Sequence, residues 1–481
     1  MNVHQPANLM PLTKAADQED ELEPPHQFES ESDQYPAIRR LIWLYFWLLL
    51  LEGALRKWFL PGLANPLLVI RDPVVILIYA LALTKGVFPR NFFVIWTSVL
   101  FVASCVAALF TEQDNRLVTL YGLRTNYLHL PLIFVFQKVL TLRDVEKLGR
   151  WLLISALPMA LLVLVQFRSS PGAWVNVGVG AAEGGQMEVG FGKIRPPGTF
   201  SFTGGLAAYL GLVAALLMAW LLKRGAVNQK LVFAAVLATG IMTAVSGSRS
   251  VLTTIAIILV GVGYVCVANS TFRGQGLRAA LIIGLAFGLL QLRQEFQQGM
   301  VVHQNRFETG GGLQHGLIER VLGGFIQPFS VIHEIPLLGN GIGLGTTAAG
   351  SLLYGERTFI LAEDEWTRII KESGPIIGIL YLALRVGIGI AMGLSGRRAL
   401  AQDNPVPMLL FCATFPLVVT GQFSLTSTLG FAAFSAGLCF AAEKLPHARK
   451  SESPELSPEL ALPPIRTVRG RSIYAEKLHG E

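Results

Sequence analysis

The stretch that decides the fold is LVFAAVLATGIMTAV-SGSRS-VLTTIAIILVGVGYVCVA, residues 231–268, in which two long apolar runs flank a short polar segment. Apolar runs approaching 20 residues are long enough to cross a bilayer as helices, and a helix satisfies its own backbone hydrogen bonds in lipid. The polar segment SGSRS, residues 246–250, then lies at a membrane surface. An arginine at such a joint either anchors a helix end or binds an anion.

The composition of the whole chain extends this pattern. Of 481 residues, 52% are hydrophobic and 15% are charged, and the mean hydropathy is +0.51. A soluble chain of this length would carry about a quarter charged residues. We therefore expect an all-α polytopic membrane protein. The net charge of +7 requires no nucleic-acid partner, because membrane topology accounts for much of it.

The apolar blocks predict about twelve transmembrane helices, near residues 41–55, 65–84, 91–110, 117–137, 150–167, 204–222, 230–246, 251–268, 278–294, 374–394, 406–421 and 427–443. Basic residues gather in alternate joints: Lys85, Arg90, Lys138, Arg143, Lys147, Arg150, Lys223, Arg224, Lys230, Arg273, Arg278, Arg397 and Arg398. Because Lys and Arg concentrate in cytoplasmic loops, both termini are expected inside the cell. SGSRS then faces outward.

The chain is expected to divide into five parts. Residues 1–38 and 446–481 are polar and proline-rich, and we expect disordered cytoplasmic tails there. Residues 39–294 and 374–445 form the membrane domain, with helices one to nine and ten to twelve. Residues 295–373 form a large periplasmic loop before the tenth helix. The cysteines all lie in apolar segments, which suggests neither disulfides nor a zinc site.

Several charges lie within or beside the predicted spans, where burying one costs at least ~2.5 kcal/mol. Glu52 and Arg56 are four residues apart and can pair on one helix face. Arg71 and Asp72 are expected to neutralise each other. Arg124 lies inside the fourth span, so we expect either a buried partner or a substrate anion. Arg385 is a further intramembrane cation, and the excess of arginine over acid suggests an anion from outside the protein.

Two arginines mark the outer boundary of the membrane. Arg195 precedes the sixth span, and Arg249 ends SGSRS. The planar guanidinium suits phosphate and keeps its charge in any setting. A lipid-linked pyrophosphate would place its anionic group at this depth, and Ser246 and Ser248 would add hydrogen-bond donors. The alternative is that both arginines only anchor helices at the interface.

A series of motifs follows in a fixed order. Arg195 and Gly198 precede GGLAAYLG (204–211), and Ser246, Ser248 and Arg249 form Ser-x-Ser-Arg. Pro336, Gly339, Gly341 and Gly343 form Pro-x-x-Gly-x-Gly-x-Gly, and Glu372 and Gly374 lead into the tenth span. Over about residues 190–380, this order resembles the O-antigen ligase and polymerase superfamily of bacterial envelope glycosyltransferases, the Wzy-like and WaaL-like integral membrane proteins.

The resemblance implies an enzyme of the bacterial inner membrane with a periplasmic active site. It would polymerise oligosaccharide repeat units, carried on undecaprenyl pyrophosphate, into exopolysaccharide, capsule or O-antigen. We expect the pyrophosphate to bind the arginines of the outer face and two further candidates, namely Arg195, Arg249, Arg124 and Arg320. The glycines of the third motif, with Glu372 and Gly374, would support the site. An O-antigen ligase, which differs in its acceptor, is the close alternative.

One departure from the family pattern concerns the catalytic base. Glu363 and Asp364 occupy the positions where ligases carry histidine and asparagine, which favours a polymerase-type relative. Glu363, Asp364 or Glu365 is expected to take the proton from the acceptor hydroxyl, as carboxylates can. The alternative is a solvated helix start, where acidic residues are favourable. The loop histidines are possible replacements: His303, His315 and His333.

The expected partners are the lipid-linked glycan donor, an acceptor glycan and the bilayer, with other envelope polysaccharide assembly proteins as further candidates. The activated carrier supplies the energy, so no metal, nucleotide or other cofactor is required. Two other classes stay open. A transporter or flippase for a glycan or anionic lipid would also use interior arginines, although it often shows internal repeats. A non-catalytic scaffold would depend on its tails rather than on Arg249 or Glu363.

Overall fold

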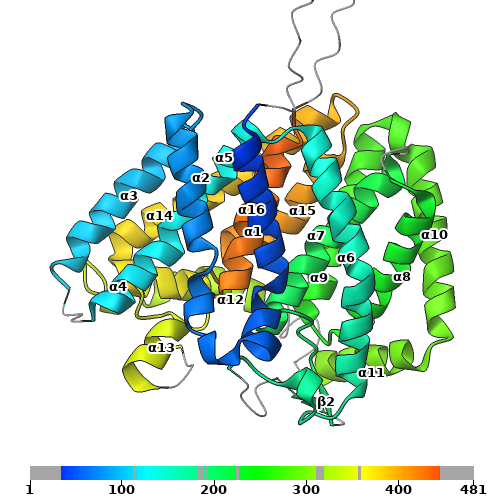
Figure 1. Ribbon diagram of the computed structural model, residues 1–481, viewed down its shortest axis with the longest axis horizontal. Helices are drawn as coiled ribbons and strands as arrows, with labels where there is room; N and C mark the ends of the chain where they lie inside the picture. Colours follow the sequence, from blue (N-terminus) through cyan, green and yellow to red (C-terminus); the bar gives the residue numbers. More distant parts are fainter. Residues whose placement is uncertain are drawn as a thin grey trace, which may run out of the picture. The chain divides into compact units, whose positions relative to one another are not determined.

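The computed structural model is helical almost throughout (Figure 1). It describes residues 34–111, 115–180, 186, 188–190, 192–223, 227–309, 319–355 and 359–444. Within these ranges, 6 helical segments are long and apolar enough to cross a membrane: Pro66–Thr84, Leu142–Arg168, Thr203–Leu222, Arg249–Ala268, Ser270–Gln291 and Glu365–Leu400. The fold agrees with the predicted all-α membrane class. The predicted C-terminal tail, and the N-terminal tail up to residue 33, lie outside the described residues.

The helices of the first half of the chain are α1 (Pro36–Ala54), α2 (Asp72–Thr84), α3 (Phe92–Ala108), α4 (Arg116–Leu123), α5 (Leu130–Val139), α6 (Leu142–Arg168), α7 (Thr203–Leu222) and α8 (Gln229–Val245). Those of the second half are α9 (Arg249–Ala268), α10 (Arg273–Gln291), α11 (Gln294–Thr309), α12 (Glu319–Ser330), α13 (Thr347–Tyr354), α14 (Glu365–Leu400), α15 (Val406–Thr420) and α16 (Thr426–Ala441).

Short elements join these helices. The single turns are η1 (Leu55–Phe59), η2 (Pro61–Leu63), η3 (Pro66–Val69), η4 (Arg124–Leu128), η5 (Trp174–Asn176), η6 (Ser270–Phe272) and η8 (Ile332–Glu334). The strands β1 (Glu188–Gly190) and β2 (Lys193–Ile194) pair antiparallel, with Glu188 opposite Ile194. This small hairpin lies in the segment between α6 and α7 and precedes Arg195 directly.

A helix covers each predicted span, but two of these helices are broken. The span predicted at 65–84 begins with η3 and continues as α2, and the span at 117–137 consists of α4, η4 and α5. Proline lies in the first turn of both α2 and α5, where its missing N–H and fixed φ are tolerated. Within the ranges given above, 6 segments meet the length and composition for crossing, and the number of twelve spans stays a prediction.

The centre of the bundle is formed by α7, α15 and α16, which pack against one another. The apolar stretch of α7 is 94% buried, whereas that of the segment containing α10 is only 17% buried. In Figure 1, α3 and α10 lie at opposite edges of the described bundle, with α16 and α7 between them. Apolar helices that expose most of their surface at the edge are suited to contact with lipid.

The segment predicted as a large loop, residues 295–373, contains α11, α12, η8, α13 and the first turns of α14. α11 packs on α8, and α12 packs on α14. α14 is kinked at Gly374, where φ is 75° and ψ is 170°. This kink lies where the tenth span was predicted to begin, so the helix extends nine residues before it into the loop region.

Candidate functional site

The SGSRS segment forms a tight corner between α8 and α9. Gly247 has a φ of 55°, a backbone conformation that favours glycine. Ser246 Oγ donates to the Thr243 carbonyl at 2.9 Å and accepts from the Ser248 amide at 3.3 Å. Both serines are buried, so they build the corner as well as lying beside Arg249. The half-buried Arg249 is the first residue of α9.

Arg195 lies in a loop that is held by side chains of two helical segments. Gly198 has a φ of 63°, and its amide donates to Gln166 Oε1 at 2.8 Å. Its carbonyl accepts from Gln166 Nε2 at 3.1 Å and from Lys57 Nζ at 2.7 Å. The amide of Gln166, at the end of α6, therefore clamps both backbone groups of Gly198. This clamp fixes the loop that carries Arg195.

Helix α11 brings two further side chains to the SGSRS corner. Arg306 Nη1 donates to the carbonyl oxygen of Gly247. One turn earlier on the same helix, His303 Nε2 lies 3.0 Å from the carbonyl oxygen of Thr243. Both contacts are made with the last turn of α8 and the residues after it, so α11 lies across the end of α8.

Arg195, Arg249 and Arg306 together form what we call the arginine cluster. Burial lowers the pKa of Arg195 to about 10, and the positive charges of Arg306 and Arg249 add to the effect. Arg195 therefore lies within electrostatic range of both Arg306 and Arg249. Like charges at short range destabilise each other, and a bound anion removes this cost. Guanidinium groups that lie this near one another make the cluster a candidate site for an anion.

His303 lies beside this cluster in a neutral form. Its side chain is buried, with 4% of the residue exposed. Burial lowers its pKa, as do the nearby charges of Arg306 and Arg195. Because a carbonyl oxygen only accepts, Nε2 carries the hydrogen that bonds Thr243. Nδ1 is then left with a lone pair, and it has no hydrogen-bond partner among the described residues. Nδ1 is itself buried, so it can act as a general base only when a hydroxyl group reaches it.

Arg124 has a partner within the protein. Its Nε lies 2.6 Å from Asp72 Oδ2 and its Nη2 lies 3.0 Å from Asp72 Oδ1. The sequence suggested that Asp72 pairs with Arg71. In the structure, Asp72 pairs with Arg124 instead. Arg71 Nε instead lies 3.0 Å from Glu52 Oε2, and Glu52 also makes the predicted pair with Arg56 at 3.4 Å. The bidentate bond to Asp72 gives Arg124 the buried partner that was one of its two expected alternatives.

The three predicted catalytic carboxylates have different surroundings. Glu363 is exposed, and its backbone carbonyl accepts from Gln422 Nε2. Asp364 caps α14, since its side chain accepts from the Thr367 amide at 2.9 Å. Glu365 is buried and bonded to two arginines. The interpretation as a helix start therefore fits Asp364, and none of the three contacts the arginine cluster through a described bond.

Glu365 belongs to a buried ion network with Arg368, Glu372 and Arg385. Arg368 donates to Glu365 through Nε at 2.9 Å and Nη2 at 3.0 Å, and to Glu372 through Nη1 at 2.6 Å. Arg385 Nη1 donates to the same Glu365 at 2.6 Å, and its other nitrogens donate to the carbonyls of Val418 and Gly421 at 2.7 Å. Arg385, expected only as an intramembrane cation, is therefore paired within the protein.

The glycine motif packs against this network. Gly339, Gly341 and Gly343 have φ values of 77°, 124° and 94°, which disfavour any other residue. A Cβ on Gly339 would lie 2.3 Å from the Glu372 carbonyl oxygen, and one on Gly343 would lie 2.2 Å from that of Val118. At these two glycines another backbone segment approaches closely. It serves packing between backbone segments, with Glu372 Oε1 accepting from the Gly345 amide at 2.8 Å.

The remaining candidates are placed as follows. Arg320 lies in the first turn of α12, and its side chain is outside what the structure describes. His315 lies outside the described residues, and His333 is exposed in η8. In the described part of the chain, no group of three His, Cys, Asp or Glu side chains is arranged to hold a metal ion.

Arg306 was not singled out from the sequence, and His303 was one of three equal candidates. The only local signal is their spacing of three residues in VVHQNRF (301–307), which places both on one face of a helix. In the folded chain this face of α11 contacts the SGSRS corner, through His303 and Arg306. No family model matches the chain, and no curated protein matches it.

Proposed function

We propose that the protein is a membrane glycosyltransferase that polymerises oligosaccharide repeat units carried on undecaprenyl pyrophosphate. The observation that carries the proposal is the arginine cluster with the neutral His303 beside it. The three arginines derive from a loop, a helix start and a helix of the 295–373 segment. Such a set favours an anion with several charged oxygens over a singly charged one.

The cluster would bind the pyrophosphate of the donor. Guanidinium groups bind phosphate oxygens in a bidentate manner. The first turn of α9 adds backbone N–H groups and the positive end of the helix dipole, a favourable site for phosphate. When the bond between sugar and phosphate breaks, negative charge grows on the leaving pyrophosphate. Fixed donors at this position stabilise that charge, which is usually a large contribution to catalysis.

His303 would supply the base. A hydroxyl group of the acceptor glycan attacks the anomeric carbon of the donor, and its proton passes to the Nδ1 lone pair of His303. A glycosidic bond forms, the anomeric carbon–oxygen bond to phosphate breaks, and the carrier pyrophosphate leaves with its electron pair. The Nε2–H bond to Thr243 fixes the tautomer and the ring orientation that this step requires. This assignment replaces the carboxylates of residues 363–365.

The choice of a polymerase rests on the resemblance described above. Glu363 and Asp364 occupy the positions of the ligase histidine and asparagine, and Asp364 is used as a helix cap. A chain that has lost those two groups is better matched to the polymerase side of the superfamily. We further propose twelve spans, with cytoplasmic termini, a periplasmic site and a location in the bacterial inner membrane. The alternation of basic joints supports this topology.

The experiment is a deletion in the native host, complemented with the wild type, Arg249→Ala or Arg116→Ala. Arg116 is a matched control because it is also an arginine at a helix start and is exposed. We expect single lipid-linked repeats to accumulate and long chains to disappear in the deletion strain. Arg116→Ala should restore long chains and Arg249→Ala should not.

The other outcomes are equally informative. Long chains that form in the deletion strain but remain on the lipid carrier would identify a ligase. Restoration of normal chain length by Arg249→Ala would refute the arginine mechanism. An unchanged glycan profile after deletion would refute the proposed activity as a whole.

A further inference from the structure

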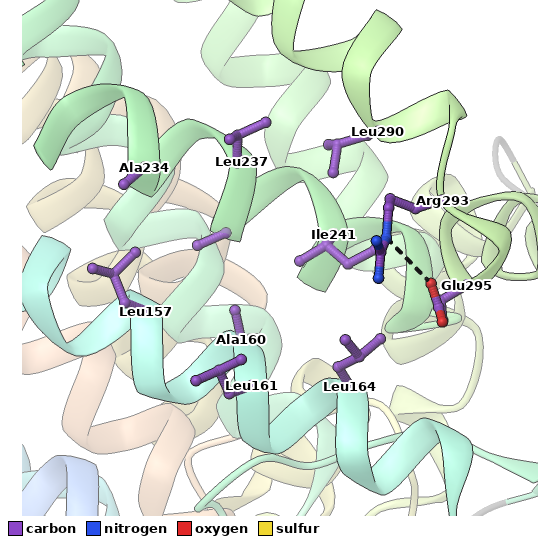
Figure 2. A pocket seen from close by; sticks show the side chains of 11 residues that line it. Leu157, Ala160, Leu161, Leu164, Ala234, Leu237, Ile241, Leu290, Arg293 and Glu295 are labelled. Carbon is purple, nitrogen blue, oxygen red and sulfur yellow. Dashed lines mark ion pairs between the residues drawn. The ribbon is translucent and has the colours of Figure 1, made fainter. Parts of the chain in front are cut away.

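The corner between α10 and α11 is fixed to the end of α6. Figure 2 shows Arg293 and Glu295 at this corner, where they form an ion pair at 3.8 Å. Glu295 also pairs with Arg168, the last residue of α6. The Glu295 side chain is only 9% exposed, and it lies in the first turn of α11, where an acidic residue is favourable. α11 therefore begins at a defined place, with its first turn attached to α6.

From this point, one face of α11 runs along the end of α8. The residues of this face recur at spacings of three and four, which brings them onto one side of a helix: Phe296, Gly299, His303 and Arg306. Phe296 packs with Ala244 of α8. His303 and Arg306 bond the carbonyls of Thr243 and Gly247. Gly299 lies between these contacts along the helix.

Gly299 allows the backbones of α11 and α8 to approach closely. A Cβ on Gly299 would lie 2.5 Å from the Ala244 carbonyl oxygen and 3.0 Å from the Val245 amide nitrogen. Distances under 3.0 Å are too short for a real Cβ atom, and backbone atoms cannot swing aside as a flexible side chain can. Gly299 does not have a positive φ, and glycine is less favourable than alanine inside a helix. The close contact with α8 is therefore what glycine provides at this position.

We propose that Gly299 is a positioning residue, which lets α11 settle on the backbone of α8 at the depth that brings His303 and Arg306 to the SGSRS corner. Since α11 is fixed to α6 at Glu295, a side chain at residue 299 would lift the helix about this point. His303 lies about 6 Å beyond Gly299 along the helix, and Arg306 lies about 10 Å beyond it. Both side chains would then move away from the carbonyls that they bond. The effect on catalysis rests on the proposed function, whereas the contact between the helices does not.

The position of His303 matters because this residue is assigned the proton transfer. Misplacing a catalytic group by about 1 Å can cost up to about 100-fold in rate. Burial lowers the pKa of His303, and the facing charges of Arg306 on α11 and Arg195 in the loop before α7 lower it further. A lifted α11 would hydrate the imidazole and move it away from Arg195. Its pKa would then rise toward the ordinary value of about 6.5.

The test compares Gly299→Ala with Gly288→Ala in the full-length protein. Gly288 is a matched control because it is an exposed glycine of α10, where a Cβ would meet nothing within 4 Å. The protein is labelled with nitrogen-15 in its histidine rings and reconstituted in nanodiscs of phosphatidylethanolamine and phosphatidylglycerol. The His303 signals are those that disappear in His303→Gln, and NMR follows them against pH. In parallel, both glycine variants complement the deletion strain, and the yield of long glycan chains is measured.

In the wild type and in Gly288→Ala, we expect His303 to stay in one neutral tautomer, with Nε2 protonated, and to titrate below about pH 6.5. In Gly299→Ala, the titration should move up toward this value, and both neutral tautomers should appear above it. The yield of long chains should fall by about 10–100-fold in Gly299→Ala and stay at the wild-type level in Gly288→Ala.

A second variant covers the case in which Gly299→Ala lowers the thermal unfolding midpoint. Glu295→Gln removes the ion pairs that hold the start of α11 without adding volume between the helices. The His303 titration should shift in the same direction. Glu308→Gln, an exposed position at the other end of α11, is the control and should leave the titration unchanged.

Two results would overturn the inference. An unchanged His303 titration in both Gly299→Ala and Glu295→Gln would mean that the contact of α11 with α8 does not set the position of His303. A shifted titration together with a wild-type yield of long chains would mean that this position has no effect on the reaction. A deletion that leaves the glycan profile unchanged would refute the proposed function, and the NMR titration would still decide whether Gly299 positions His303.

Discussion

Arginine occurs in two contrasting settings in this protein. In the buried ion network, Arg368 is bonded to two carboxylates and is 1% exposed. In the arginine cluster, burial and the positive charges of Arg306 and Arg249 lower the pKa of Arg195. The first arrangement pairs the cation with carboxylates of the same network, and the second brings cations within range of one another. A buried arginine bonded to carboxylates of the fold is therefore weaker evidence for a ligand site than several arginines that lie near one another.

The two regions should also differ in the property that a substitution changes, which is stability in the buried ion network and activity in the arginine cluster. Breaking a buried ion pair leaves an uncompensated charge, which strongly destabilises a fold. Removing one of several mutually repelling cations relieves repulsion and costs the fold little. Substitutions in the two regions should therefore differ in the property that they change, as well as in the size of the effect.

The largest effect is expected from Glu365→Gln in the buried ion network. The variant keeps the shape of the side chain but leaves Arg368 and Arg385 without their shared carboxylate. We expect a loss of about 3–5 kcal/mol in stability, measured as the thermal unfolding midpoint and the monodisperse fraction after detergent extraction. The control is the exposed neighbour, Glu363→Gln, which should behave like the wild type. Equal stability of both variants would contradict the structural role of the network.

At the arginine cluster, a substitution should lower the reaction rate and leave the stability of the fold unchanged. Arg249→Gln is expected to lower the polymerisation rate by about 10²–10³-fold, the usual cost of losing a transition-state donor. Its unfolding midpoint should stay constant or rise, since repulsion between partly exposed charges amounts to about 1 kcal/mol or less. Arg249→Lys keeps the charge without the planar fork and should recover only part of the rate. A parallel loss of rate and stability would assign Arg249 to the fold instead.

His303 tests whether the cluster is paired with a base. His303→Gln should reduce the rate at neutral pH by about 10²-fold. In the wild type, the neutral imidazole is the active form, and its pKa is lowered from the ordinary 6.5. The rate should thus be constant near neutral pH and fall only in acid below 6.5, and the variant should lack this decline. His333→Gln, at an exposed position, should keep it. If the rate of His303→Gln falls in acid as the wild-type rate does, His303 is excluded as the base.

The smallest effect concerns the backbone beside the buried network. A Cβ on Gly374 would lie 2.1 Å from the Leu337 carbonyl oxygen, and φ there is 75°. Gly374→Ala should therefore destabilise the protein by about 1–3 kcal/mol, measured by the same thermal midpoint. The matched control is Gly284→Ala in α10, where a Cβ would meet nothing within 4 Å. That change should be neutral or slightly stabilising. Equal midpoints would mean that the kink adapts freely.

The helices were predictable from hydropathy because apolar length is a local property of the sequence. The pair of Glu52 and Arg56 was predictable for the same reason, since residues four apart face each other on one helix. The partners of Arg71, Asp72 and Arg124 were not, because each is set by packing between helices. Consecutive residues such as Arg71 and Asp72 point in different directions, and each found a distant partner.

The candidate site was predicted only in part. Arg195 and Arg249 were recognisable from their position at span ends, whereas the carboxylates of residues 363–365 were chosen by alignment with a motif. Glu365 is used in the ion network and Asp364 in a helix cap. Arg306 and His303 contribute only because α11 lies across the end of α8, a tertiary arrangement that no sequence pattern encodes.

Glu372 joins the ion network to the glycine motif. Its side chain accepts from Arg368 and from the Gly345 amide, and its backbone carbonyl accepts from the Gly341 amide at 3.2 Å. The irregular backbone of residues 339–345 therefore cannot unfold locally without breaking hydrogen bonds to Glu372, whose buried carboxylate would then be exposed to solvent. In hydrogen exchange, the amides of Gly341 and Gly345 should be protected like those of a core helix, as part of one cooperative unit with α14.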